Sequence, residues 1–77
     1  MTAIIGEMIR AERERRGMTQ HAASMHLCIH PRTVSTWETG RSCPSTRYHR
    51  TIAGWLGVSL REVSDACLSA EARARLP

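Results

Sequence analysis

The sequence contains no lysine, and all eleven of its basic residues are arginines. The planar guanidinium of arginine suits paired hydrogen bonds to phosphate or guanine, whereas lysine offers a point charge. A GC-rich genome would produce the same bias, so composition alone leaves both explanations open. The chain has only three prolines and is 42% hydrophobic and 23% charged, which favours a folded domain over a disordered one.

Long apolar runs are also missing. No stretch of about 18 apolar residues is present to span a bilayer, and Met1 to Arg10 lacks the basic and then apolar pattern of a secretion signal. We therefore expect a cytoplasmic protein with no membrane partner. A chain of 77 residues has enough apolar side chains for one core and one domain.

The three cysteines, Cys28, Cys43 and Cys67, are an odd number and have no C-x-x-C spacing. This pattern favours neither a disulfide framework nor a zinc finger. His26, Cys28 and His30 lie close together in sequence, but a turn separates them and a fourth ligand is missing. We therefore expect reduced thiols, no metal and no other cofactor.

Signatures of catalysis are absent as well. The sequence shows no convincing set of serine, histidine and acid, no paired carboxylates and no phosphate-binding glycine loop. We therefore expect a protein that is not an enzyme, has no catalytic residue and takes no small-molecule ligand.

The positive charge is concentrated in the middle of the chain. The net charge of +4 and the pI near 9.8 favour a polyanionic partner. Between His30 and Arg50, Glu38 is the single acidic residue. The basic residues of that stretch are Arg32, Arg41, Arg47 and Arg50.

Helical patterns and helix-ending residues recur every ten to fifteen residues, and no strand pattern persists. The expected helices run from Ala3 to Arg16, from Thr19 to His26, from Pro31 to Thr39, from Ser45 or Thr46 to Leu56, and from Ser59 onward. Their inward positions are Ile5, Met8, Ile9, Glu12, Ala23, Ser24, Leu27, Val34, Trp37, His49, Ile52, Ala53, Leu56, Leu60, Val63 and Cys67. The sequence therefore predicts an all-α, compact five-helix bundle, in which residues 69–77 either extend the last helix or fray.

Several short motifs resemble the Cro and lambda-type repressor (XRE-like) helix-turn-helix family. They are Gly17-Met18-Thr19-Gln20, Val34 and Trp37-Glu38-Thr39-Gly40-Arg41, with Ile5-Gly6 and Arg13 upstream and Pro44-Ser45, Ile52-Ala53 and Leu56-Gly57-Val58-Ser59 downstream. The resemblance covers about residues 4 to 64. It implies a lambda-repressor-like helix-turn-helix DNA-binding domain in residues 1–68, whose second helix crosses the DNA backbone and whose third enters the major groove.

The resemblance implies that the third helix reads bases. Arg32 is the first candidate, because its guanidinium can bind O6 and N7 of guanine, although a phosphate contact is the alternative. Ser35 and Thr36 match other outward positions, where hydroxyls contact bases and the Thr36 methyl meets a thymine methyl. Pro31 departs from the polar residue usual in the family and could offer only an apolar contact.

Other positions match residues that contact the DNA backbone in the family. These phosphate-contacting candidates are Thr19, Gln20, His30, Thr33, Arg41 and Arg47. Two of them have alternatives: Gln20 could instead position the recognition side chains or simply be solvated, and His30 could simply cap its helix.

Two further positions concern stability. The resemblance implies a bridge from Arg13 to Glu38 that fixes the angle of the third helix, and removal of one partner would cost about 3 to 5 kcal/mol. Cys28 stands where the family usually has a glycine in the left-handed conformation, which would cost cysteine roughly 1 to 2 kcal/mol.

A single module of this kind buries too little surface for tight specific binding, so we expect a homodimer, formed in solution or only on DNA. Trp55, Val58, Leu60 and Val63 could form an exposed apolar patch for self-association. Alternatively, Trp55 covers the edge of the core.

The expected function is sequence-specific binding of a double-stranded DNA operator by a transcriptional regulator, associated with the nucleoid of a bacterial cell. A phage or prophage Cro-like repressor is favoured because the chain ends just after the reading domain. The alternatives are an antitoxin that regulates its own operon and an architectural or excision cofactor that binds DNA.

Overall fold

The structure, a computed structural model, describes residues 4–75, and the side chains of residues 4–68. The helices are α1 (Ile5–Arg15), α2 (Gln20–Leu27), α3 (Pro31–Glu38), α4 (Thr46–Leu56) and α5 (Leu60–Arg75). No strand occurs in this part of the chain, which confirms the all-α prediction. The expected start at Ala3 lies outside the described residues. The alternatives for residues 69–77 were an extension of the last helix or a frayed tail, and α5 continues without a break as far as Arg75.

Side chains at the starts of α2 and α3 satisfy backbone groups that a helix leaves without a partner. Thr19 Oγ1 accepts a hydrogen bond from the N–H of Ala22 at 3.0 Å. His30 Nδ1 accepts one from the N–H of Arg32 at 3.0 Å. Pro31 occupies the first turn of α3, where its missing N–H costs nothing. Both helices therefore begin where the sequence predicts.

The turn between α2 and α3 has the left-handed conformation that the resemblance implies. Cys28 ends α2 with φ 58° and is the one non-glycine residue with a positive φ in the described chain. This conformation places the Cβ of an L-residue close to its own carbonyl group. The turn therefore keeps its geometry at a cost in stability, which a glycine would avoid.

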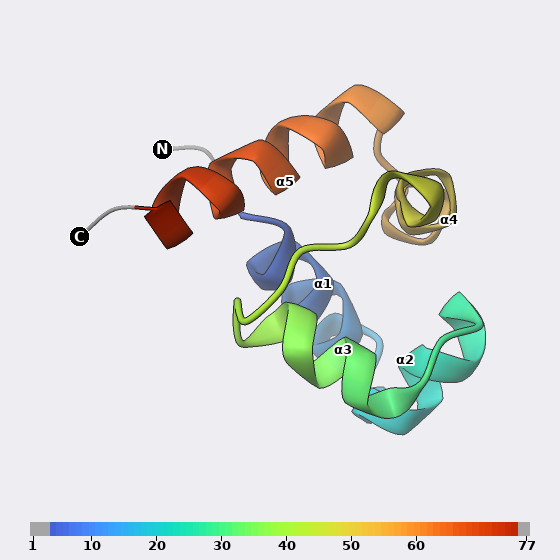
Figure 1. Cartoon of the computed structure of the whole chain (residues 1–77). Helices are drawn as coiled ribbons and strands as arrows, with labels where there is room; N and C mark the ends of the chain where they lie inside the picture. The colour runs from blue at the N-terminus through green and yellow to red at the C-terminus, as the bar shows by residue number, and fades with distance from the viewer. Residues whose placement is uncertain (1–3, 76–77) are drawn as a thin grey trace.

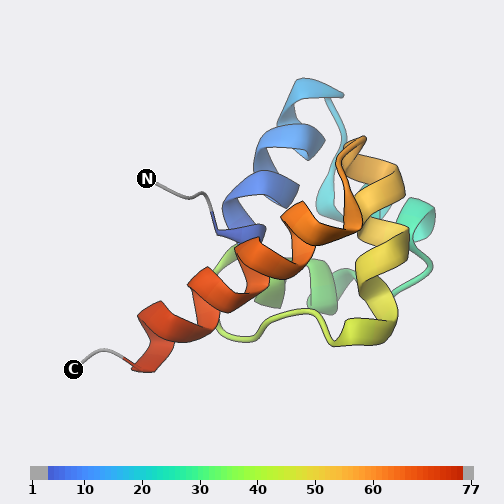
Figure 2. The ribbon, with the colours of Figure 1, turned by 90° about the horizontal axis from the view of Figure 1, so that it is seen from above.

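The five helices surround one core. Figure 1 shows α2 and α3 together on one side of the molecule, α5 on the opposite side and α1 between them. Contacts join α1 to α3, α4 and α5, and α4 also contacts α2 and α5. Figure 2 shows the last turns of α5 extending beyond the other helices. The core consists of Ile5, Ile9, Ala23, Leu27, Val34, Trp37, Ile52, Ala53, Trp55, Val63, Ala66 and Cys67.

Gly6 allows α1 to approach α3 closely. A Cβ at this position would lie 2.2 Å from the carbonyl oxygen of Trp37, a distance at which backbone atoms must move. Glycine is therefore required here for the distance between two helices rather than for a turn. This contact fixes the far end of α3 against α1.

Of the alternatives for Trp55, the structure supports the edge of the core and corrects the prediction of an exposed apolar patch. Trp55 is only 9% exposed and Val63 is fully buried, because the guanidinium of Arg16 lies 4.8 Å over the Trp55 ring and Val63 faces the core. Val58 is half-buried against the core. Leu60, expected in both the core and the patch, is 47% exposed and lies away from the core.

Candidate nucleic-acid interface

The exposed face of α3 is hollowed and polar. Val34 and Trp37 turn inward, so the side chains between them face outward. Together with the loop that follows α3, they form a hollow of about 420 Å³ lined by Arg32, Ser35, Thr36, Thr39 and Arg41. Its lining contains two guanidinium groups, three hydroxyls and no carboxylate. This surface, the α3 hollow, suits a polyanion with hydrogen-bonding groups.

An ion pair fixes α3 against α1. Arg13 Nε donates to Glu38 Oε2 at 2.8 Å and Arg13 Nη2 to Glu38 Oε1 at 2.9 Å, a bidentate arrangement. Arg13 Nη1 also donates to the carbonyl of Met18 at 3.0 Å. The Glu38 hydrogen bonds raise the pKa of Arg13. This is the bridge that the family resemblance implied, and it joins α1, the turn before α2 and the end of α3.

Gln20 belongs to the same cluster. Its Nε2 donates to Glu38 Oε1 at 3.3 Å, so the first turn of α2 is linked to the last turn of α3. Of the alternatives for Gln20, this contact supports the one in which Gln20 positions the side chains of α3. Glu38 therefore connects three elements, and its side chain is only 4% exposed.

Aromatic contacts position Arg47 at the start of α4. The Arg47 guanidinium lies 4.8 Å over the ring of Tyr48, and its Nη2 donates to the Tyr48 hydroxyl at 2.8 Å. The Tyr48 ring meets Trp37 of α3 edge-on, with 5.5 Å between centroids. These contacts connect an exposed cation on α4 with α3.

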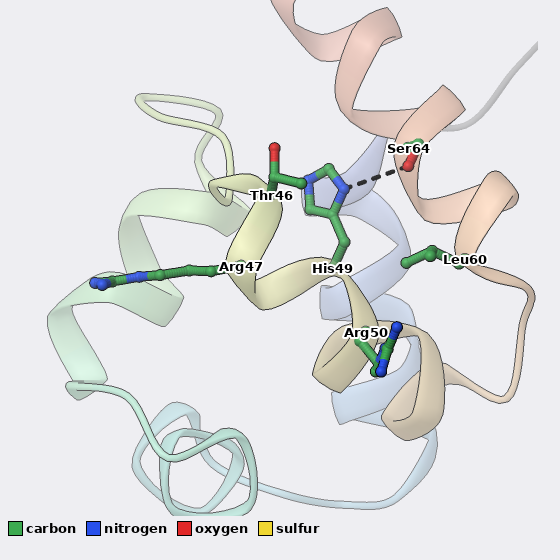
Figure 3. Close-up of a pocket in the computed structure, with 6 residues that line it drawn as sticks. All are labelled: Thr46, Arg47, His49, Arg50, Leu60 and Ser64. Atoms are coloured by element: carbon green, nitrogen blue, oxygen red, sulfur yellow. Dashed lines mark hydrogen bonds between the residues drawn. The ribbon is translucent and has the colours of Figure 1, made fainter.

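A buried histidine joins the α3–α4 loop to α5. His49 Nε2 lies 3.2 Å from the carbonyl oxygen of Pro44, and Nδ1 lies 3.3 Å from Ser64 Oγ. A carbonyl can only accept, so Nε2 donates to Pro44, and in the neutral imidazole Nδ1 then accepts from the Ser64 hydroxyl. Figure 3 shows this ring directed toward Ser64, with the Arg47 side chain directed away from both. His49, Ser64 and Arg47 are among the residues that line a pocket of about 430 Å³.

Sequence reasoning placed His49 among the core positions and gave it no other role. The missed signal is chemical: a histidine at a core position needs a partner for each ring nitrogen. Both partners lie outside α4: the Pro44 carbonyl belongs to the preceding loop and the Ser64 hydroxyl to α5. His49 therefore ties Pro44 to α5, and Pro44 ends the loop that carries Arg41.

Comparison with known protein families identifies the chain. A family model described as helix-turn-helix matches residues 9–63. The chain belongs to the Cro and lambda-repressor type of this family. No curated protein and no solved structure matched it.

Membership in this family makes the protein a DNA-binding protein of the transcription-regulator type. The matched range contains α2, α3 and α4 entirely, and therefore the α3 hollow as well. The family is not typically enzymatic. No group of three potential metal ligands occurs among the described side chains, and none of the described helices is long and apolar enough to cross a membrane.

The structure brings some of the predicted DNA contacts together and leaves others apart. Arg32, Ser35, Thr36 and Arg41 line the α3 hollow. Thr39 also lines it but was not predicted, since sequence reasoning took it as the end of the helix. The candidates that do not line the hollow are Thr19, Gln20, His30, Pro31, Thr33 and Arg47.

Proposed function

We propose that the protein is a sequence-specific transcriptional repressor of the phage or prophage Cro-like kind, acting on an operator in the bacterial cytoplasm. The observation that carries this proposal is the α3 hollow, a cationic and hydroxyl-lined surface without a carboxylate on the exposed face of the recognition helix. The Arg13–Glu38 pair supports it, because a fixed helix angle is needed to align several side chains with base edges.

In this proposal, α3 enters the major groove of the operator. Arg32 lies in the first turn of α3 with an exposed side chain, so its guanidinium can reach O6 and N7 of guanine. Arg41, in the exposed loop after α3, contacts a phosphate. Arg47 contacts the backbone from the start of α4, where Tyr48 supports its guanidinium.

The start of α2 and the start of α3 supply further contacts to DNA phosphates in this proposal. Thr19 and Gln20 stand at the helix N-terminus, where N–H groups and the helix dipole favour phosphate. Gln20 Nε2 donates one proton to Glu38 and keeps its second proton for a phosphate. His30 uses Nδ1 as the cap of α3, so its Nε2 carries the proton and remains a donor for phosphate. Thr33, in the first turn of α3, supplies a hydroxyl to a phosphate in this proposal.

We further propose that the protein acts as a homodimer on a two-fold symmetric site. Specific protein–DNA interfaces bury about 1,000 to 2,500 Å² of protein surface, and single modules bury less. Two copies that read half-sites one helical turn apart double the contacts. The need for tight DNA binding is what supports the dimer, because the buried Trp55 and Val63 offer no surface for self-association.

Selection of bound sequences from a random duplex pool at physiological salt tests the proposal. We expect an enriched palindrome with half-sites about ten base pairs apart. Enrichment of a single unpaired site would overturn the dimer and leave the sequence-specific regulator. No enrichment would overturn the repressor proposal and favour the antitoxin or the architectural alternative.

A further inference from the structure

Two of the three hydroxyls that line the α3 hollow, those of Thr36 and Thr39, already donate their protons within the chain. Thr36 Oγ1 donates to the carbonyl oxygen of Arg32 at 2.7 Å. Thr39 Oγ1 lies 3.0 Å from the carbonyl oxygen of Ser35 and 3.2 Å from that of Thr36. A hydroxyl has one proton to donate and two lone pairs that accept. Both threonines can therefore accept a hydrogen bond from DNA but cannot donate one without breaking a bond within α3.

Arg32 has the opposite character. A guanidinium only donates hydrogen bonds and has no lone pair that accepts. Within the described chain the Arg32 side chain makes no hydrogen bond or ion pair, so all its donors are available to the α3 hollow. Arg32 and Thr36 stand one helical turn apart, and the first is a donor whereas the second is an acceptor with a methyl group.

Base pairs differ in the same properties along the major groove. Guanine presents two acceptors, N7 and O6, while an A·T pair presents the N6 amino donor of adenine and the C5-methyl group of thymine. An acceptor beside a methyl group matches the A·T pair and does not match the acceptors of guanine. Cytosine also offers an amino donor but lacks the methyl group.

We propose that Thr36 selects an A·T pair, with its Oγ1 accepting from the N6 amino group of adenine and its methyl group touching the methyl group of thymine, while Arg32 selects a nearby G·C pair. This inference rests on the proposed operator binding. Four residues of helix span about 6 Å and successive bases about 3.4 Å, so the two selected pairs lie within roughly two base pairs of each other.

The test uses the duplex that the wild-type protein enriches, with one thymine at a time replaced by uracil, which removes only the methyl group. Binding of each duplex is measured by fluorescence anisotropy. Two variants are matched to the two contacts: Thr36→Ser keeps the hydroxyl and loses the methyl group, and Thr36→Val keeps the methyl group and loses the hydroxyl. Thermal unfolding checks that both variants fold like the wild type.

At one thymine in each half-site, uracil should weaken wild-type binding about fourfold, as expected for one buried methyl group. The Thr36→Val protein should show the same loss, and Thr36→Ser less than twofold. Replacing the paired adenine by purine, which lacks the amino group, should weaken binding by the wild type and Thr36→Ser but not by Thr36→Val.

Two results would overturn the inference in distinguishable ways. A uracil penalty that stays the same in Thr36→Ser at every thymine would refute the Thr36 contact and leave operator binding intact. A pool from which the wild-type protein enriches no sequence would refute operator binding and this inference together.

Discussion

The two sides of the molecule are held together by different forces. On the recognition side, α1, α2 and α3 meet at Glu38, which pairs with Arg13 and Gln20 through hydrogen bonds of defined direction. On the other side, α4 and α5 pack through apolar residues such as Ile52 and Val63, with His49 to Ser64 as a polar link between neutral groups, and the indole N–H of Trp55 is buried with no partner in the described chain. The charged hydrogen-bond network therefore lies at α3, the helix that the proposed function places in the major groove.

Breaking the Glu38 cluster should have the largest effect. Glu38→Ala leaves the guanidinium of Arg13, only 15% exposed, without its carboxylate, and should lower the free energy of unfolding by about 3 kcal/mol. Glu38→Gln keeps the shape of the side chain and one acceptor oxygen, so it should lower the free energy of unfolding by less. Urea denaturation measures both, and equal stability of Glu38→Ala and the wild type would show that the cluster does not stabilise the fold.

The close approach of α1 to α3 should be the next most sensitive feature. Gly6→Ala places a Cβ against the carbonyl of Trp37 and should cost about 2 kcal/mol through overpacking. Gly54→Ala is the matched control, because no atom of another segment lies within 4 Å of its Cβ position. Gly54→Ala, in the interior of α4, should raise the free energy of unfolding by about 0.5 to 1 kcal/mol. Thermal unfolding compares the two variants. A shift of the melting temperature in the same direction for both would contradict the close approach of α1 to α3.

Relief of strain in the turn between α2 and α3 should have a smaller effect of opposite sign. Cys28→Gly removes the cost of the left-handed conformation at φ 58°, partly offset by the greater freedom of glycine in the unfolded chain. We expect a gain of about 1 kcal/mol or less in chemical denaturation. Cys28→Ala keeps a Cβ and should give no such gain, so a gain from both would point to the thiol instead.

The smallest effect concerns acid pH and α1. Hydrogen bonds from Arg15 and Arg16 lower the pKa of Glu12 from 4.5 to about 2. Because the folded pKa is the lower one, the contribution of Glu12 to stability is full above about pH 4.5 and is lost as the pH falls toward 2. The stability difference between the wild type and Glu12→Gln should shrink across that window. A stability difference that stays constant between pH 4.5 and 2 would show that ionised Glu12 does not stabilise α1.

Local signals in the sequence predicted most of the fold. Thr19 and His30 precede helices as capping residues, and Gly57 ends α4 in the left-handed conformation. These features depend on a few neighbouring residues, so the pattern is sufficient to place them. The Arg13–Glu38 pair, 25 residues apart, was expected through the family resemblance alone.

Features that depend on distant segments were missed. For Trp55, which lies off the apolar stripe of α4, the sequence left an exposed patch and the edge of the core as alternatives. The second is the one that the structure supports, because Arg16 donates to the Trp55 carbonyl at 2.6 Å and covers its ring. The role of His49 depends on Pro44 and Ser64, which no periodicity brings together. The state of the Thr36 hydroxyl was equally hidden, because a sequence does not show which proton a side chain has already donated.

The salt dependence of DNA binding by Arg32→Ala and Arg41→Ala tests the central claim that α3 reads bases while the following loop contacts phosphate. Arg41→Ala should weaken binding to all sequences about equally and lower the salt slope by about one. Arg32→Ala should also flatten the preference for the selected sequence over a scrambled duplex. Identical effects of the two substitutions on slope and preference would contradict the account.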